Sequence, residues 1–154
     1  MRVRYTHPMD IDQVNALLAQ PTYNQMTANE SALAREWLKR HAADYDSVQF
    51  NVRLGDGVTL PFEADAAIQR QARLSTQRRA DIIARSPNHA TIVELKSTLN
   101  EEALLQLQIY QSLFSAENPE VESLALTAAG YAIEPETAKL LADYGVTVEL
   151  YPKP

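Results

Sequence analysis

Residues 79–83 (RADII) and 91–96 (TIVELK) decide the fold of this chain. Both segments are rich in the aliphatic and β-branched residues that favour strands, and residues 86–89 (SPNH) between them are typical of a turn. The pattern predicts a β-hairpin. Asp81 and Glu94 are equally far from the middle of the turn, so a regular hairpin makes them cross-strand neighbours.

The predicted hairpin brings two acids together on a face that should be apolar. Like charges whose Cβ atoms lie about 5 Å apart destabilise a sheet unless a cation lies between them. Lys96 follows Glu94 by two residues, and the period of a strand places both on one face. Two acids that hold a hard metal, with a lysine beside them, indicate a site for attack on a phosphodiester.

The same register places Arg79 opposite Lys96. Because two cations repel each other, we expect the strands to separate there or to share an anion. This is where the scissile phosphate is expected.

The composition limits the possible classes of protein. With 154 residues, the chain is expected to form one ordinary domain with a core of its own. It has no cysteine, which excludes disulfides, zinc ribbons and thiol nucleophiles. No apolar stretch approaches the roughly 20 residues of a membrane span, and no export signal is recognisable. We therefore expect a soluble, cytoplasmic protein without membrane partners.

The charge of the chain is unevenly distributed. The formal net charge is −6, which is unusual for a protein that binds nucleic acid. Residues 69–98, however, contain six basic and two acidic side chains, a net charge of +4 against −10 for the remainder. We predict a basic band that binds an anionic backbone; the alternative is that these arginines only solvate a surface. The band consists of Arg70, Arg73, Arg78 and Arg79.

The rest of the pattern predicts an α/β sandwich with a mixed central sheet. Apolar residues at helical spacing indicate helices at residues 10–18, 28–43, 100–115 and 135–144. Besides the hairpin, strands are expected at residues 48–54, 121–128 and 146–150. Within residues 58–77, we expect a short strand at 59–62 followed by a basic loop.

These residues resemble the PD-(D/E)xK nuclease superfamily, which has the restriction-endonuclease-like fold. Asp81 corresponds to the first acid of the motif and Glu94-Leu95-Lys96 to the (D/E)xK, while Arg79-Ala80 replaces the usual proline. The resemblance covers residues 27–150 and implies a three-layer α/β/α sandwich. We therefore divide the chain into a nuclease-like domain, residues 27–154, and an N-terminal extension, residues 1–26, that could serve for docking.

The helix after the hairpin carries a second sign of this resemblance. Gln106 and Tyr110 match the Gln-x-x-x-Tyr signature of the RecB-like branch. The helix is expected to bury Leu105, Ile109, Leu113 and Phe114, with Gln106 and Tyr110 inside the same arc. A glutamine buried there without a partner costs roughly 1 to 3 kcal/mol, so we expect it to face the polar edge of the sheet. Ser97 or Thr98 is the expected cap of this helix.

The family also has a glutamate on the helix before the hairpin. Glu30 is the first candidate and Glu36 the second. The alternative role for Glu30 is structural, because an acid in the first turn of a helix is favoured by the helix dipole.

The resemblance implies a metal-dependent nuclease. Asp81, Glu94 and the Leu95 carbonyl would hold Mg²⁺ or Mn²⁺, and Glu30 would help to hold its water or a second ion. Lys96 would orient or deprotonate the attacking water, with Gln106 and Tyr110 supporting the site. The implied partner is nucleic acid, with DNA as the first expectation, and a homodimer or larger complex is possible.

Two other interpretations remain open. The chain could be a non-catalytic member of the same fold, with an assembly or nucleic-acid-binding role in a larger complex such as a viral particle. It could also be an unrelated α/β domain in which Glu94 and Lys96 form a surface ion pair worth at most about 1 kcal/mol.

Overall fold

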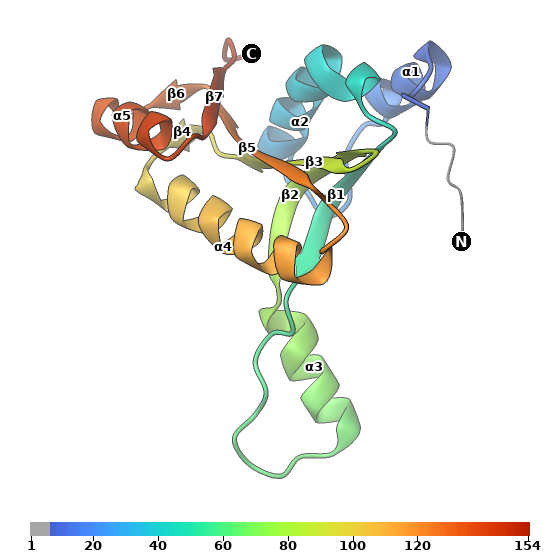
Figure 1. The fold of residues 1–154 in the computed structure, drawn as a ribbon, viewed down its shortest axis with the longest axis vertical. Coiled ribbons are helices and arrows are strands. Elements are labelled where there is room, and N and C mark those ends of the chain that lie inside the picture. Colours follow the sequence, from blue (N-terminus) through green and yellow to red (C-terminus); the bar gives the residue numbers. More distant parts are fainter. Residues whose placement is uncertain (1–6) are drawn as a thin grey trace.

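The computed structural model describes residues 7–154, which form a five-stranded sheet covered by helices (Figure 1). The strands lie in the order β1-β2-β3-β5-β7; β1, β2 and β3 are antiparallel, and β3, β5 and β7 are parallel. The strands are β1 (Ser47–Leu54), β2 (Arg78–Ser86), β3 (His89–Leu95), β5 (Ser123–Gly130) and β7 (Thr147–Leu150). The helices are α1 (Ile11–Ala19), α2 (Ala28–His41), α3 (Ala66–Thr76), α4 (Glu101–Glu117) and α5 (Pro135–Asp143), with a 3-10 turn at Ala42–Asp44.

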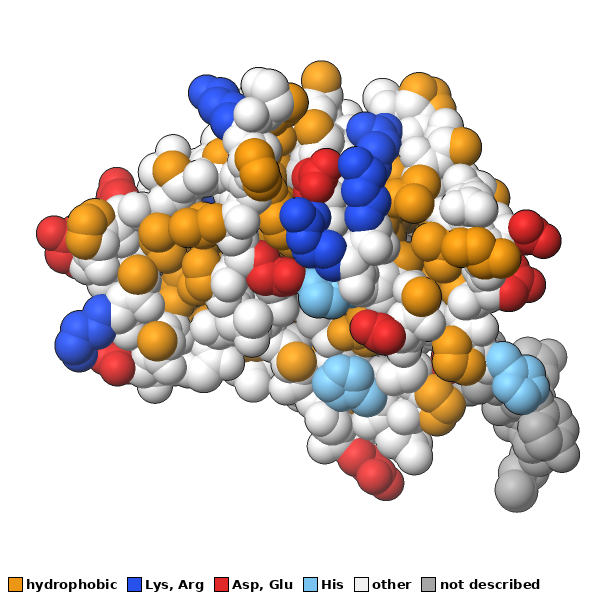
Figure 2. All heavy atoms as spheres, turned by 90° about the horizontal axis from the view of Figure 1, so that it is seen from above, with side chains coloured by type: hydrophobic (Ala, Val, Ile, Leu, Met, Phe, Trp, Pro, Cys, Tyr) orange, Lys and Arg blue, Asp and Glu red, His pale blue; other side chains and the backbone are white. Residues whose placement is uncertain are grey.

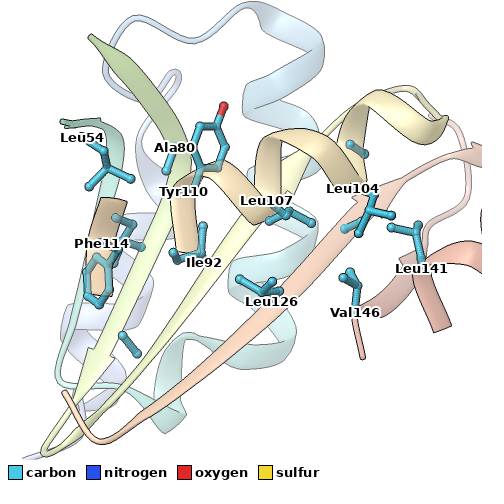
Figure 3. Close-up of a cluster of buried hydrophobic side chains, with 14 of the residues drawn as sticks. Leu54, Ala80, Ile92, Leu104, Leu107, Tyr110, Phe114, Leu126, Leu141 and Val146 are labelled. Carbon is cyan, nitrogen blue, oxygen red and sulfur yellow. The ribbon is translucent and has the colours of Figure 1, made fainter. Parts of the chain in front are cut away.

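Two apolar clusters, one on each face of the sheet, confirm the three-layer α/β/α sandwich. One cluster contains the buried face of α4 together with Leu141 of α5 (Figure 3). The other contains Trp37 and Leu38 of α2 and Val14 of α1. Neighbouring residues of β3 supply both clusters, because successive side chains of a strand point to opposite faces. The mixed sheet is therefore buried on both sides.

The N-terminal segment is part of this packing. Val14, Tyr23 and Met26 are buried in the cluster around α2, and the ring of Tyr23 stacks on Phe50 of β1. The described part of residues 1–26 therefore packs on the domain, while residues 1–6 lie outside the described residues. A docking role for this segment stays a prediction. Within residues 7–154, no helix is long and apolar enough to cross a bilayer.

The hairpin has the predicted register. Ser86 pairs with His89 across a two-residue turn, and the ladder continues to Ile82 opposite Val93. Asn88 in the turn has φ +61°, the left-handed conformation that tight hairpin turns require and asparagine tolerates. One further step along this ladder places Asp81 opposite Glu94.

Strand β1 contains an irregularity at Asn51 that the sequence did not reveal. Val48 and Phe50 pack against the α1–α2 cluster, whereas Val52 and Leu54 belong to the α4 cluster. A regular strand would place all four on one face. Asn51 has φ +51°, which turns the strand over between the two pairs.

Strand β2 is irregular next to Asn51 in the same way: its side chains change faces there. Ala80 belongs to the α4 cluster and Ile82 to the α2 cluster, although they are two residues apart. Ala80 pairs with Val52 and Ile82 with Phe50, so the shared irregularity lies where Asn51 faces Asp81. Arg79 is opposite Arg53 of β1. On the other edge of β2, the ladder with β3 ends at Ile82 and Val93, so Arg79 does not pair with Lys96 and the strands separate there, as one of the two expected outcomes required. The main-chain N–H of Lys96 instead donates to the Ala129 carbonyl of β5 at 3.1 Å.

Residues 55–77 form an arm that projects from the sheet (Figure 1), and the prediction of a strand and a basic loop there is wrong. Asp65 accepts a hydrogen bond from the Ile68 N–H at 2.9 Å and caps α3, none of whose residues is buried. Gln69 of α3 bonds back to the loop at Leu60. Gly57, at φ +73°, lies so close to the Arg73 carbonyl that a Cβ would be only 2.2 Å from that oxygen. These contacts fold the arm onto itself.

Helix α4 also differs from its prediction. Its buried residues are Ala103, Leu104, Leu107, Tyr110 and Phe114, and Leu105 is 58% exposed. The buried stripe is therefore rotated relative to the predicted one. Asn100, not Ser97 or Thr98, caps the helix, because Thr98–Leu99 forms β4, which pairs with β6 (Ala132–Ile133) in a small second sheet.

We predict that Asn51→Gly keeps the stability of the protein within about 0.5 kcal/mol, because glycine adopts positive φ without strain. Asn51→Val should lower the free energy of unfolding by about 1 to 3 kcal/mol, because a β-branched side chain is strained in this conformation. Urea unfolding of both variants checks this. Equal effects of glycine and valine would mean that Asn51 is not needed to turn the strand over.

Candidate active site

Asp81 and Glu94 lie side by side at the ends of β2 and β3. Glu94 is only 7% exposed, and Asp81 is half-buried. One carboxylate oxygen of Asp81, Oδ2, accepts the main-chain N–H of Leu95 at 2.7 Å. This bond links the first acid to the strand that carries the second and holds the Asp81 side chain next to Glu94.

Asp81 destabilises the charged form of Glu94, whereas a hydrogen bond from Glu94 lowers the pKa of Asp81. Burial raises the pKa of Glu94 above its usual range, and the neighbouring Asp81 carboxylate raises it further. Burial also raises the pKa of Asp81; the Leu95 N–H opposes that rise, and Glu30 adds to it. Within residues 7–154, Glu94 Oε2 is buried and has no hydrogen-bond partner. A buried oxygen without a partner, next to a second acid, is suited to a cation.

A pocket of about 310 Å³ opens beside this pair. The start of α2 forms one wall with Thr27, Asn29, Glu30 and Leu33, and residues 94–97 with Gln106 form the other. The side chain of Thr27 caps α2 by accepting the Glu30 N–H at 3.2 Å, which places Glu30 in the first turn at the rim of the pocket. Glu30 therefore lies in the first turn of α2, where the helix dipole favours an acid, and it also faces the pocket beside Glu94.

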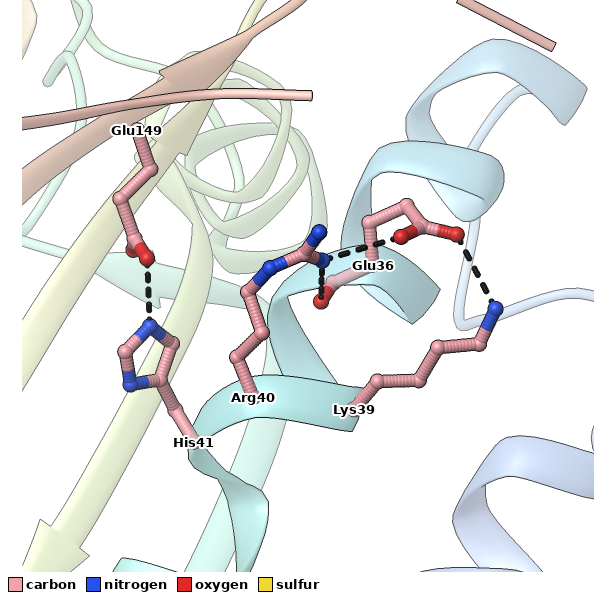
Figure 4. A network of polar contacts seen from close by, with 5 residues as sticks. All are labelled: Glu36, Lys39, Arg40, His41 and Glu149. Atoms are coloured by element: carbon pink, nitrogen blue, oxygen red, sulfur yellow. Dashed lines mark hydrogen bonds and ion pairs between the residues drawn. The ribbon is translucent and has the colours of Figure 1, made fainter. Parts of the chain in front are cut away.

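Glu36, the second candidate for this position, belongs to a different surface. It accepts hydrogen bonds from Lys39 at 3.0 Å and from Arg40 at 2.9 Å (Figure 4), and Arg40 lowers the pKa of its carboxyl. Basic and acidic side chains alternate on this face of the molecule (Figure 2). In the same network, His41 bonds Glu149 of β7 at 2.6 Å. Glu36 is thus engaged away from the acid pair.

Lys96 borders the pocket but bonds to a residue of α4. Its Nζ lies 3.1 Å from Glu102 Oε2, and the amide of Gln106 donates to Glu102 Oε1 at 3.3 Å. Glu102 thus connects the two predicted site residues, and the sequence analysis missed it. The available signal was its spacing, because Glu102 and Gln106 are four residues apart on one helical face.

Tyr110 is buried beneath the acid pair. It is 5% exposed, and its ring packs among apolar side chains while its hydroxyl points away from them (Figure 3). Burial raises the pKa of Tyr110 above its usual value, with Glu94 and Asp81 adding to the rise and Arg78 opposing it. Tyr110 therefore remains a neutral hydrogen-bond donor near both acids.

The four predicted nucleic-acid-binding arginines do not form one continuous band. Arg70 and Arg73 lie on the arm, where they line a pocket of about 320 Å³ with Asp56 and Thr59. Arg78 and Arg79 lie where the arm meets the sheet, and as successive strand residues they point to opposite faces. The turnover of β2 places Arg79 on the α2 side. Arg78 influences Tyr110, whereas Arg79 donates to Gln25 on the α2 side.

The described residues offer a partial set of metal ligands. No three His, Cys, Asp or Glu side chains of residues 7–154 converge closely enough to hold an ion by themselves. Asp81, Glu94 and the Leu95 carbonyl form the best oxygen donor set, and the unpartnered Glu94 Oε2 fits a hard divalent cation. Such a cation would complete its coordination with water and substrate oxygens, as Mg²⁺ commonly does.

Comparisons with known proteins leave the family open. No protein-family model matches the chain, and no curated protein matches it. Among solved structures, the chain is similar to a chain in "Structure of EndoMS-dsDNA2 complex", with 13% sequence identity and a TM-score of 0.46. The match covers 88% of this chain and 50% of that chain, so this chain spans about half of its length. At this identity and TM-score, the similarity carries no argument about activity.

We predict that Glu94→Gln makes the stability of the metal-free protein less dependent on pH. The pKa of Glu94 is higher in the folded than in the unfolded protein, so protonation of Glu94 favours the folded state. This contribution to stability is complete at pH values below the ordinary glutamate pKa of about 4.3. This contribution is lost as pH rises through the raised pKa. In EDTA and at alkaline pH, the variant should therefore be more stable than the wild type by about 1 to 3 kcal/mol.

Urea unfolding from mildly acidic to alkaline pH measures this difference. Glu101→Gln, which removes an exposed acid of α4, is the matched control and should keep the wild-type pH dependence. Parallel curves for Glu94→Gln and the wild type would show that Glu94 is not held as a costly buried acid.

Proposed function

We propose that this chain is a Mg²⁺- or Mn²⁺-dependent nuclease that hydrolyses phosphodiester bonds of DNA. The observation that carries the proposal is the Asp81–Glu94 pair: a buried and a half-buried acid lie side by side, and Glu94 Oε2 has no partner in residues 7–154. A structural ion pair does not explain this arrangement, because Lys96 bonds Glu102 instead of either acid. A metal site explains it directly.

In this proposal, Asp81, Glu94 and the Leu95 carbonyl hold the metal. Glu30, at the rim of the same pocket, assists from α2. The bound ion would supply a lowered pKa for the attacking water and would neutralise charge on the phosphate. The protein's own part is to keep the two carboxylates close and away from bulk solvent, which strengthens their electrostatic interactions.

Lys96 has the role of a cation beside the reacting phosphate. Its ammonium can offset negative charge that develops on the phosphate oxygens and can orient the attacking water. Glu102 fixes the Lys96 side chain at 3.1 Å, and Gln106 in turn holds Glu102. Tyr110 supports the acids from below as a neutral donor.

The arginines would bind the DNA backbone. Arg70 and Arg73 project on the arm, and Arg78 lies at its base, so a duplex placed against the acid pair could contact them together. Contacts of this kind contribute affinity without sequence preference. A homodimer would bring a second site to the opposite strand, which extends the proposal to cleavage of both strands.

The non-catalytic alternative has one observation in its favour. Lys96 is engaged by Glu102, and no three-acid group converges within the described residues. A binding component of a larger complex would need the basic side chains but not the acid pair. The two proposals therefore differ in whether metal and Lys96 matter.

We predict that Lys96→Ala lowers metal-dependent cleavage of a plasmid or oligonucleotide by about 10²-fold or more, because it removes a cation that stabilises the transition state. EDTA should abolish cleavage by the wild type. Lys139→Ala is the matched control, because it removes an exposed lysine of α5 whose partner is Asp143. Cleavage that survives both Lys96→Ala and EDTA would rule out the proposed mechanism.

We predict that the combined change of Arg70, Arg73 and Arg78 to Ala weakens DNA binding and flattens its salt dependence. Each lost phosphate contact reduces the slope of log K against log salt by about 0.9, so the total reduction should be about 2 to 3. Fluorescence anisotropy in EDTA at several salt concentrations measures the slope. An unchanged slope would mean that these arginines only solvate the surface.

A further inference from the structure

A second polar cluster lies on the α2 side of the sheet, close to the acid pair. Its centre is Gln25, in the loop before α2, whose side-chain carbonyl accepts hydrogen bonds from Arg79 of β2 and from the Asn51 amide at 3.3 Å. Both contacts use the same oxygen, so the Gln25 amide nitrogen remains available as a donor. None of these contacts belongs to the site around Asp81 and Glu94.

The cluster contains a repulsive pair of cations. Arg53 of β1 and Arg79 of β2 are directly opposite in the ladder. Like charges in this position destabilise a sheet unless something neutralises them. Among residues 7–154, no acid forms an ion pair with either guanidinium. The arrangement is therefore suited to an anion that both arginines approach.

Two residues of this cluster also have an unusual backbone conformation. In the described residues, three non-glycine residues have positive φ: Gln25 at +54°, Asn51 at +51° and Asn88 at +61°. Asn88 lies in the hairpin turn, where this conformation is expected. The other two touch each other in the cluster. Strain of this kind costs of order 1 to 3 kcal/mol per residue and persists where the surroundings, often a binding site, require it.

The cluster is adjacent to the proposed catalytic site. Asn51 lies in β1 between the residues that pair with Ala80 and Ile82, which places it opposite Asp81. Thr27, two residues after Gln25, lines the pocket beside Glu94. Neighbouring strands are about 4.8 Å apart, so the main chains of Asn51 and Asp81 are separated by about one strand spacing, with the side chains of the cluster on the α2 side.

We propose that Gln25, Asn51, Arg53 and Arg79 form a second phosphate site, which holds the backbone phosphate next to the one at the acid pair. This second site rests on the proposed nuclease function, because the same DNA strand would cross both the acid pair and the arginine cluster. The guanidinium groups bind phosphate oxygens with charge and directed hydrogen bonds, and the Gln25 amide nitrogen adds a neutral donor. These are positioning residues, which fix the register of the strand relative to Asp81 and Glu94.

The turnover of β1 and β2 is what builds this site. Without it, Arg79 would point to the α4 face with Asp81, and Arg53 would follow Asn51 to that side. The positive φ of Asn51 moves both arginines to the α2 face, where Gln25 meets Arg79. The strain therefore has a function that the fold alone does not explain.

Gln25→Glu tests this proposal, because the variant has nearly the same shape. If the cluster is only structural, a carboxylate at position 25 strengthens the contact with Arg79 and leaves DNA binding unchanged. If the cluster holds a phosphate, the new charge repels it, because like charges opposed across an interface weaken binding. We therefore expect an affinity loss of about tenfold or more, with no decrease in the melting temperature.

The measurement is fluorescence anisotropy with a short fluorescein-labelled DNA duplex in EDTA, where no cleavage occurs. Gln108→Glu, at an exposed glutamine of α4, is the matched control for the change in net charge and should bind within twofold of the wild type. Arg79→Gln, measured in the same way, should reduce the slope of log K against log salt by about 0.9. Binding by Gln25→Glu within twofold of the wild type, or no binding of DNA by the wild type, would overturn the proposal.

The cleavage assay separates this proposal from the proposed function. If the wild type cleaves and Lys96→Ala does not, yet Gln25→Glu binds and cleaves normally, only the second phosphate site is wrong. If no metal supports cleavage but Gln25→Glu still weakens binding, the phosphate site stands and the nuclease function is wrong.

Discussion

The arrangement of two carboxylates side by side in a buried part of the sheet is the constraint on which the rest of this structure depends. Burial and mutual repulsion both raise the pKa of Glu94, so the folded protein holds a costly charge or a proton there. The costs are tolerated because the surrounding apolar clusters, on both faces of the sheet, are extensive. Lys96 and the Leu95 N–H offset only part of this cost, so the pair lowers the stability of the fold.

The parts of the fold that surround the pair each bring one kind of group to it. The first turn of α2 brings Glu30, and the first turns of α4 bring Glu102 and Gln106. The irregularity at Asn51 decides which face each neighbouring arginine takes, and Arg79 lies on the α2 side against Gln25. The positions of these groups therefore depend on the helices and also on the place where β1 and β2 change faces.

Local sequence patterns predicted the centre of the site and failed at its periphery. The register of Asp81 and Glu94 follows from a two-residue turn and strict alternation, which are short-range properties. Arg79 was placed opposite Lys96 because the pairing of β2 with β3 was assumed to continue, but the ladder ends at Ile82 and Val93. The buried face of α4 was misplaced because Leu105 looked apolar enough to be inside, although packing against the sheet selects Leu104 and Leu107. In the arm, Asp65 was not recognised as a helix cap among glutamines and arginines.

The distribution of strain shows how the acid pair and the arginine cluster depend on each other. The acid pair requires regular pairing between β2 and β3, because its register brings the carboxylates together. The arginine cluster requires irregular pairing between β1 and β2, because only a turned strand moves Arg53 and Arg79 away from the acids. If both arginines shared a face with Asp81, they would form ion pairs with the carboxylates and compete with a metal for them. The strained residue at position 51 therefore keeps Arg53 and Arg79 from ion pairs with the acids, and in the proposed function it leaves both groups for an anionic substrate.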